Sequence, residues 1–181
     1  MDKRISSYSA PLTSSVTDYP EEYAKATGKL FLAPVEKGKT HRIVDVGTGT
    51  GIWAVEAGDA FPNAEVAGID PSAIQPNFVP PNVKFEINDG ESPWVGDVRY
   101  NFIFTRHMAC SIADWPRPLR NDIYTSLNNN GWAEFQDYEL MFKADDGTLT
   151  DDHETMKWIK PANEVSNKVG RELNPGPKLY N

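Results

Sequence analysis

A glycine cluster between a short apolar run and a helix-like run is the feature that most constrains the fold of this chain. In "RIVDVGTGTGIWAVEAGDAF", glycines stand at Gly47, Gly49 and Gly51. Glycine adopts unusual backbone angles and lets a ligand approach without a clashing Cβ. A strand that ends in such a turn and continues into a helix is typical of open α/β sheets, whose ligands bind beyond the carboxyl ends of the strands. Two interpretations of the cluster alone are open: a site for a nucleotide-like ligand, or a tight connection between a strand and a helix.

Strand and helix patterns alternate on both sides of this cluster, which favours an α/β fold with a mostly parallel sheet and helices on both faces. The predicted strands are "RIVDVG", "AEVAGID", "NVKFEIND", "YNFIFTR" and "WAEFQDYELMF". The predicted helices are a short one capped by Thr17 or Asp18, "GIWAVEAGDAF" with Ile52 and Val55 facing inward, "RPLRNDIYTSLNNNG" ending at Gly131, and one from about Asp151 that Pro161 kinks or interrupts.

The length of 181 residues suits one domain. Residues 1–17 are rich in Ser, Thr and Pro and poor in large apolar groups. Such a composition does not repay the entropy of ordering a core, so we expect a flexible N-terminal arm over 1–17 and a single domain over 18–181.

The net charge of −8 and the isoelectric point of about 4.9 disfavour binding to nucleic acid or to an anionic membrane surface. Cys110 is the single cysteine and cannot form an internal disulfide, and no pair of cysteines has metal-ligand spacing. We therefore expect no metal site. Because no signal peptide or membrane-spanning run is visible, we expect a cytoplasmic or nuclear protein.

Acids near the glycines indicate which nucleotide-like ligand the site takes. The dinucleotide fingerprint G-x-G-x-x-G requires glycine where this chain has Ile52, which argues against an NAD-dependent oxidoreductase. Asp45, two residues before the first glycine, repels a pyrophosphate but attracts a ligand ammonium group. Asp70 closes the second predicted strand, where an acid can accept hydrogen bonds from ribose hydroxyls.

Asp89 follows the third predicted strand and can accept from the exocyclic amine of adenine, with Gly90 allowing close approach of the backbone. Each acid taken singly could instead be a helix cap or a turn residue. A ligand with an ammonium group, a ribose diol and an adenine amine satisfies all three acids together. S-adenosyl-L-methionine carries these groups. The residues predicted to bind it are Asp45, Gly47, Thr48, Gly49, Gly51, Asp70, Asp89 and Gly90.

The segments "GTGTGIWA", "IQPNFVPPNVKFEI" and "SIADWP" make the sequence resemble the LaeA-like methyltransferases of filamentous fungi over most of residues 29–173. This resemblance implies the Rossmann-like class I methyltransferase fold and S-adenosylmethionine binding by Asp45 to Gly51, Asp70, Asp89 and Gly90. It also implies methyl transfer to a small molecule of fungal secondary metabolism. Some members of that family are regulators, so the alternative is a non-catalytic protein that works through protein partners.

Class I sheets normally have seven strands, and this chain shows no pattern for strands six and seven. We therefore expect the fifth strand to form an open sheet edge, which favours a protein partner or self-association there.

His107 follows the fourth predicted strand and is the candidate general base, since its ordinary pKa lies near neutrality. A structural histidine is the alternative. Trp115 could line the pocket or pack in the core, and Glu134, Gln136 or Asp137 could face the cleft.

Overall fold

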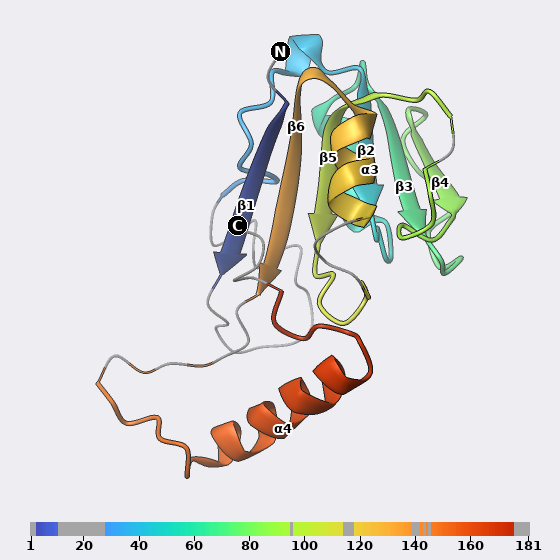
Figure 1. The fold of residues 1–181 in the computed structure, drawn as a ribbon. Helices are drawn as coiled ribbons and strands as arrows, with labels where there is room; N and C mark the ends of the chain where they lie inside the picture. Colours follow the sequence, from blue (N-terminus) through green and yellow to red (C-terminus); the bar gives the residue numbers. More distant parts are fainter. Residues whose placement is uncertain are drawn as a thin grey trace.

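A six-stranded parallel sheet forms the centre of the molecule in the computed structural model (Figure 1). The structure describes residues 3–10, 28–94, 96–113, 118–138, 142, 144 and 146–175. The strand order is β1-β6-β5-β2-β3-β4, and every neighbouring pair is parallel. The strands are β1 (Arg4–Ala10), β2 (Arg42–Val46), β3 (Glu65–Asp70), β4 (Val83–Ile87), β5 (Tyr100–Arg106) and β6 (Leu127–Tyr138).

The five predicted strands are confirmed as β2 to β6. The centres of β3 and β5 are continuous buried runs, because both faces of the sheet are covered there. β4, at an edge, alternates apolar residues with Lys84 and Glu86. Alternate residues of β2 and β5 enter two separate cores: Val44 and Ile103 belong to one, and Ile43 and Phe102 to the other. The α/β architecture expected from the sequence is therefore present.

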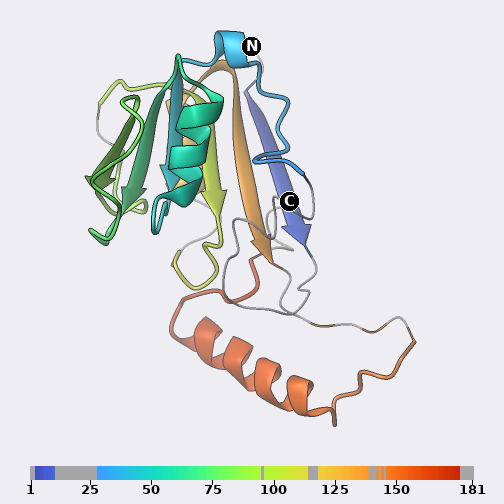
Figure 2. The same cartoon turned by 180° about the vertical axis from the view of Figure 1, so that it is seen from behind.

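Helix α2 (Ile52–Ala60) covers one face of the sheet and α3 (Pro118–Ser126) the other, as opposite views show (Figures 1 and 2). The prediction for α2 was wrong about Ile52, which is exposed because it begins the helix at the mouth of a hollow. Trp53 is buried instead: its ring stacks on Phe104 with centroids 3.9 Å apart, and its Nε1 donates to the carbonyl of Leu30.

The boundary between α3 and β6 also differs from the prediction. The helix ends at Ser126, and "LNNNG" lies in β6 rather than in the helix. At this point the pairing of β5 with β6 shifts register between Tyr100 and Phe102, and Asn130 has a φ of 63°. A Cβ on Gly131 would lie 3.0–3.1 Å from three backbone oxygens, so the irregular strand passes too close to its neighbours for a side chain there.

Helix α4 (Glu154–Lys168) lies beyond the carboxyl ends of the strands (Figure 1). Its N-cap is His153, whose Nδ1 accepts a hydrogen bond from the backbone N–H of Thr155. Pro161 lies inside the helix and does not interrupt it. Because Pro161 has no N–H, the helix loses one backbone hydrogen bond there and continues on both sides. The helix predicted near Thr17 lies outside the described residues.

The N-terminal segment is the main correction to the sequence analysis. Residues 4–10, expected within a flexible arm, form β1 and pair with β6 from Arg4 with Trp132 to Ala10 with Tyr138. An edge strand is held by main-chain hydrogen bonds to its neighbour, so the low apolar content of this segment does not prevent its ordering. Residues 11–17 lie outside the described part.

This pairing also corrects the expectation of an open edge at the fifth strand. Within the described residues no strand follows β6 along the chain, yet β6 is not an edge, because β1 occupies the position beside it. The edges of the sheet are β1 and β4. Self-association at an exposed β6 edge therefore has no basis in this structure.

Glu134 joins the segment before β2 to the sheet. Its side chain is completely buried, and its two carboxylate oxygens accept from the backbone N–H groups of Leu32 and Ala33 at 2.7–3.0 Å and from Gln136 Nε2 at 2.6 Å. A buried carboxylate is tolerated where several donors satisfy it. Glu134 thus has a structural role and does not face the cleft.

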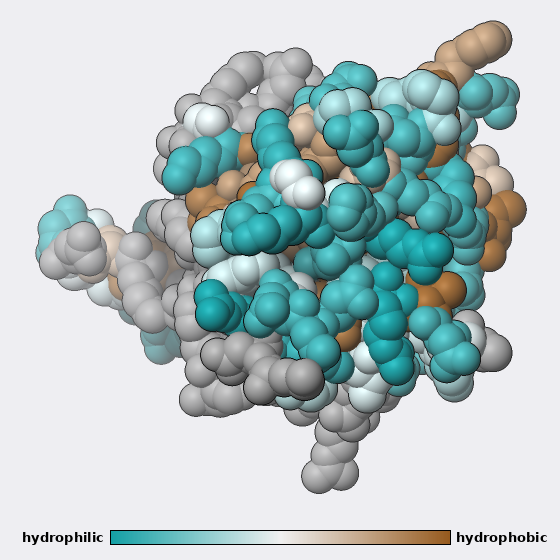
Figure 3. All heavy atoms as spheres, turned by 90° about the horizontal axis from the view of Figure 1, so that it is seen from above, coloured by the Kyte–Doolittle hydropathy of each residue, from teal (hydrophilic) through white to brown (hydrophobic). Residues whose placement is uncertain are grey.

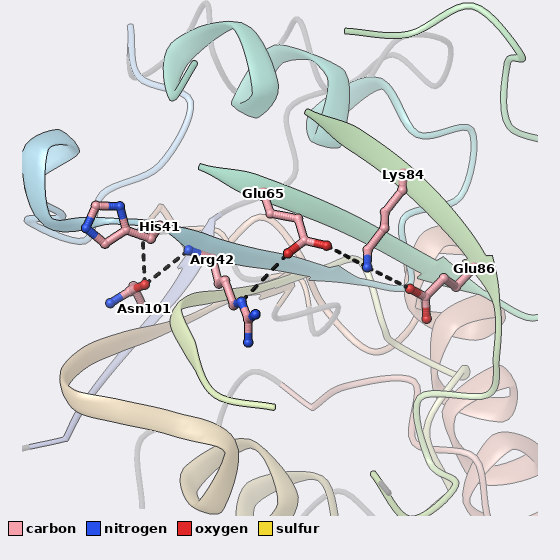
Figure 4. Close-up of polar contacts among 6 residues, drawn as sticks. All are labelled: His41, Arg42, Glu65, Lys84, Glu86 and Asn101. Atoms are coloured by element: carbon pink, nitrogen blue, oxygen red, sulfur yellow. Dashed lines mark hydrogen bonds and ion pairs between the residues drawn. The ribbon is translucent and has the colours of Figure 1, made fainter. Parts of the chain in front are cut away.

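Charged residues line the sheet face near the starts of β2, β3 and β4 (Figure 4). Lys84 Nζ lies 2.6 Å from Glu65 and 3.3 Å from Glu86, and Arg42 Nε lies 3.7 Å from Glu65. These pairs are half exposed and contribute little to stability. The end of the molecule at which the strands start is also largely hydrophilic on its surface (Figure 3). Among the described residues, no helix is both long and apolar enough to span a bilayer.

Candidate cofactor site

Two hollows open on the sheet, and their linings differ in chemistry. One, of about 240 Å³, lies on the sheet face beside the charged row of Arg42, Glu65, Lys84 and Glu86, whose charges are already paired with one another. The other, of about 500 Å³, lies at the carboxyl ends of β2, β3 and β5 and contains the glycine loop. The second hollow is where ligands of parallel α/β sheets bind.

Almost all predicted site residues meet in this larger hollow. Its lining includes Asp45, Gly47, Thr48, Gly49, Asp70, Asp89, Gly90 and His107. Gly51 does not line it. Gly51 is buried at the N-terminus of α2 with a φ of 81°, and a Cβ there would lie 2.4 Å from the Phe85 ring. The third glycine is therefore required by packing between α2 and β4.

The glycine loop is held by the strand beside it. Gly47 has a φ of 73°, a left-handed conformation, and its N–H donates to the carbonyl of Ile69 at 2.9 Å. The N–H of Gly49 donates to Asp70 Oδ2 at 2.9 Å. Because both donors are bonded to β3, the loop is fixed in shape. A Cβ on Gly47 would lie 2.3 Å from the sulfur of Met108, whereas the space beside Gly49 is open.

Asp45 lies at the bottom of the hollow and is 3% exposed. Thr48 Oγ1 donates to its Oδ2 at 2.6 Å. Burial raises the pKa of Asp45 from 3.8 to about 6, against the opposing effects of the Thr48 hydrogen bond and the Arg106 charge. Since desolvation is the main cause, a cationic group bound in the hollow would stabilise the ionised carboxylate of Asp45.

Asp70 and Asp89 each use part of their hydrogen-bonding capacity within the chain. Asp70 Oδ1 accepts from the N–H of Ser72 at 2.8 Å, in addition to its bond with Gly49. Asp89 Oδ1 accepts from the N–H of Glu91 at 2.9 Å. An ionised carboxylate has about four acceptor positions, so both side chains keep capacity for a ligand hydroxyl or amine.

His107 lines the same hollow and has a left-handed backbone, with a φ of 57°. This conformation is uncommon for a residue with a Cβ and is found preferentially at functional sites. Burial, with the neighbouring Arg106 charge, lowers the pKa of His107 from 6.5 to about 4. Its imidazole is therefore neutral near pH 7 and can accept a proton, although it is a weak base.

Several residues of the lining were not predicted from the sequence, among them Arg106, Met108 and Ile112. Arg106 ends β5 on the residue before His107, so its place at the carboxyl end of a strand is the signal that could have found it. Asp137 helps to hold this loop, because its Oδ2 accepts from the N–H of Met108 at 2.8 Å. Trp115 lies outside the described residues.

The three carboxylates of the hollow fit the polar groups of S-adenosylmethionine that donate hydrogen bonds. Asp45 can accept from the ammonium group, Asp70 from the ribose hydroxyls and Asp89 from the adenine amine, so each of these donor groups of the ligand has an acceptor. The same three acids fit a dinucleotide poorly, because a pyrophosphate at the glycine loop would lie near the charge of Asp45.

Comparison with known proteins points the same way. The family model described as "Methyltransferase domain" matches residues 17–172. The chain is 42% identical over 153 residues to the methyltransferase pytC of Aspergillus terreus. The aligned region covers 83% of this chain and 46% of pytC. It is 44% identical over 137 residues to the secondary metabolism regulator LAE1 of Cochliobolus heterostrophus, covering 72% of this chain and 44% of LAE1.

Among solved structures, the chain resembles the O-methyltransferase of a trans-AT polyketide synthase multienzyme of Brevibacillus brevis, solved in complex with S-adenosyl-L-homocysteine. The TM-score is 0.50 at 16% identity, over 66% of this chain and 44% of that one. This likeness concerns the fold. The chain spans less than half the length of the two curated relatives described above.

Proposed function

Since this chain belongs to the methyltransferase domain family, we propose that it binds S-adenosylmethionine in the larger hollow and directs methyl transfer to a small molecule of fungal secondary metabolism. The observation that carries the proposal is the meeting of Asp45, Asp70 and Asp89 around the glycine loop. They come from the ends of three successive strands, β2, β3 and β4, and they match the ammonium, ribose and adenine-amine donors of this cofactor.

Each of these residues binds a different part of the cofactor. Asp45 takes the ammonium group of the methionine part, which lies along the backbone of Gly47 and Gly49. Asp70 takes the ribose hydroxyls, and Asp89 with Gly90 takes the adenine. The three attachments fix the orientation of the cofactor in the hollow.

Bound in this way, S-adenosylmethionine supplies an already activated methyl group. The protein's main task is then to hold the acceptor in line with that group and to exclude water. His107 is the candidate to accept the proton of a hydroxyl acceptor, since it lines the hollow and is neutral at pH 7. Methyl transfer is supported by the likeness to the methyltransferase pytC, and the link to secondary metabolism by the likeness to LAE1, named a secondary metabolism regulator.

Calorimetric titration with S-adenosylhomocysteine tests the cofactor assignment. The wild-type chain should bind, and Asp70→Ala should weaken binding by about tenfold or more, because it removes a charge-assisted acceptor of the ribose. Asp59→Ala is a matched control, since Asp59 is an exposed acid on α2 outside the hollow lining. Equal binding by all three chains, or no heat with any of them, would contradict the assignment.

The likeness to LAE1, a regulator by name, favours a second candidate function. In this alternative the chain keeps the cofactor fold and acts through protein partners without turnover. Incubation of the purified protein with labelled S-adenosylmethionine and the metabolites that accumulate in a deletion strain separates the two. A labelled small molecule supports the enzyme, whereas co-purification with a protein partner and no labelled metabolite supports the regulator.

A further inference from the structure

We propose that Arg171 and Glu91 are positioning residues for the cofactor, because they fasten together two loops that form one wall of the larger hollow. The proposal rests on the proposed function, as it concerns the shape of the same site. We call the set of contacts made by Glu91, Arg171 and Glu172 with the loop at residues 107–113 the clasp.

The first of the two loops follows β4 and carries Asp89 and Gly90. It is tied back to β3, since the N–H of Asn88 donates to the carbonyl of Asp70 at 3.1 Å. The N–H of Ser92 donates to the carbonyl of Asp89 at 3.0 Å, which closes a turn. The side chain of Glu91 leaves this turn and reaches the second loop, where its Oε1 accepts from the N–H of Ala113 at 2.7 Å.

The second loop follows β5, at residues 107–113. Ser111 and Ile112 lie in the lining of the hollow, and Ile112 is 1% exposed. This loop has no regular secondary structure, and two of its residues, His107 and Cys110, have left-handed backbones. Its shape therefore depends on contacts with the segments around it.

Arg171 supplies such contacts from a segment far along the chain. Its Nη1 donates to Glu91 Oε2 at 2.8 Å and to the carbonyl of Ser111 at 2.6 Å. One guanidinium group thus joins the first loop to the second. The N–H of Cys110 also donates to the carbonyl of Glu172 at 2.7 Å, so the backbone after α4 lies along the same loop.

The position of Arg171 is itself fixed by the end of α4. Its N–H donates to the carbonyl of Ser166 at 3.0 Å, and the hydroxyl of Ser166 donates to the carbonyl of Arg171. Ser166 is 8% exposed. The clasp therefore joins α4, the loop that carries Asp89, and the loop that carries Ser111.

Along the sequence, the clasp contacts lie within two residues of residues that line the hollow. Glu91 follows Asp89 and Gly90, and Ala113 follows Ile112. Loss of the clasp would let both loops move apart and would displace the acceptors of the adenine end. By linkage, a cofactor that binds only the fastened arrangement must in turn stabilise the clasp.

The test compares S-adenosylhomocysteine binding and thermal unfolding in the wild type, Arg171→Gln, Glu91→Gln and the double variant. We expect each single variant to weaken binding by about tenfold and the double variant to be no weaker than either, because both remove one coupling. Arg171→Lys keeps the charge and should recover part of the affinity. Lys160→Gln is the matched control, since Lys160 lies on α4 and its ion pair with Asp151, which precedes the helix, is not part of the clasp.

Unchanged affinity in Arg171→Gln, with or without a lower unfolding temperature, would overturn the clasp and leave the cofactor assignment intact. Failure of the wild type to bind would instead remove the proposed function and the clasp with it. If Arg171→Gln does not fold, hydrogen exchange on the wild type decides. S-adenosylhomocysteine should then slow exchange at residues 107–113 and 166–172 but not at 154–160, and equal exchange with and without ligand would overturn the clasp.

Discussion

At the scale of single residues, the buried carboxylate of Asp45 lowers the stability of the protein without ligand and favours the binding of a cationic ligand. Burial raises its pKa from 3.8 to about 6, so above pH 6 the folded chain holds an ionised carboxylate that water would stabilise better. Below pH 3.8 the group is protonated in both the folded and unfolded states and has no such cost. Without ligand, the free energy of unfolding is therefore lowered by Asp45 in the pH range where its carboxylate is ionised, which is the range where it can bind a cation.

Replacing Asp45 with Asn should stabilise the empty protein at pH 8 while abolishing cofactor binding. The pKa difference corresponds to a free energy of unfolding of about 3 kcal/mol, since one unit is about 1.4 kcal/mol. The amide oxygen still accepts from Thr48. Denaturant unfolding of both chains at pH 8 and below pH 4 measures the gain, which should disappear at the lower pH. An asparagine variant less stable than the wild type at pH 8 would contradict the pKa argument.

The same carboxylate should make cofactor binding depend on pH. Only ionised Asp45 attracts the ligand ammonium, so the affinity for S-adenosylhomocysteine should be highest above pH 6 and should fall as the pH drops through that value. The decrease should approach about tenfold per pH unit, the limit for one proton. Titration calorimetry from pH 5 to 8 measures it. A flat profile would show that Asp45 does not contact the charged group.

Glu134 should contribute to stability and not to binding. Glu134→Ala leaves the backbone N–H groups of Leu32, which is partly buried, and of Ala33, which is buried, without their acceptor, at a cost in the free energy of unfolding of about 3 kcal/mol. Glu134→Gln keeps one oxygen and should cost less. Exposed Glu164→Ala, on α4, is the control and should change stability by no more than about 0.5 kcal/mol. Urea unfolding compares the three variants, and equal stabilities would contradict the role assigned to Glu134.

At the scale of elements, β2, β3 and β5 were predictable because each is a largely apolar run bounded by turn residues, and β4 and the second half of β6 because apolar and polar residues alternate there. The site followed from the same logic, since acids at the ends of parallel strands meet at one edge. The boundary at Ser126 was missed because "NNNG" is typical of a helix end, whereas here it forms the irregular start of β6. The role of Gly51 depends on contact with Phe85, which sequence spacing does not reveal.

β1 was missed for a different reason: its pairing with β6 involves backbone atoms of residues distant in the sequence. Deletion of residues 1–10 should expose the β6 edge, lower the unfolding temperature and cause concentration-dependent association. Sedimentation at several concentrations measures the association. The double variant Lys3→Ala and Arg4→Ala is the control, because it removes the cation–π contacts with Tyr124 and Trp132 and keeps the backbone ladder. A truncated chain that remains monomeric would show that the β6 edge is protected in another way.

At the scale of the whole molecule, ligand binding should raise the unfolding temperature, since the three acids come together only in the folded chain. S-adenosylhomocysteine at 100 times its dissociation constant should add about 2.7 kcal/mol to the free energy of unfolding. Thermal scans with increasing ligand measure this shift, and S-adenosylhomocysteine should not shift Asp45→Asn. An increase of the same size in Asp45→Asn would place the ligand elsewhere.

The pairing of β1 with β6 has a consequence for synthesis on the ribosome. β1 precedes the other strands described here, yet its partner residues, Trp132 to Tyr138, are synthesised only after β2, β3, β4 and β5. The glycine loop and the three acids can therefore come together before β1 has a strand to pair with. During that interval β1 has no strand beside it, and its backbone hydrogen bonds form only when β6 has been synthesised.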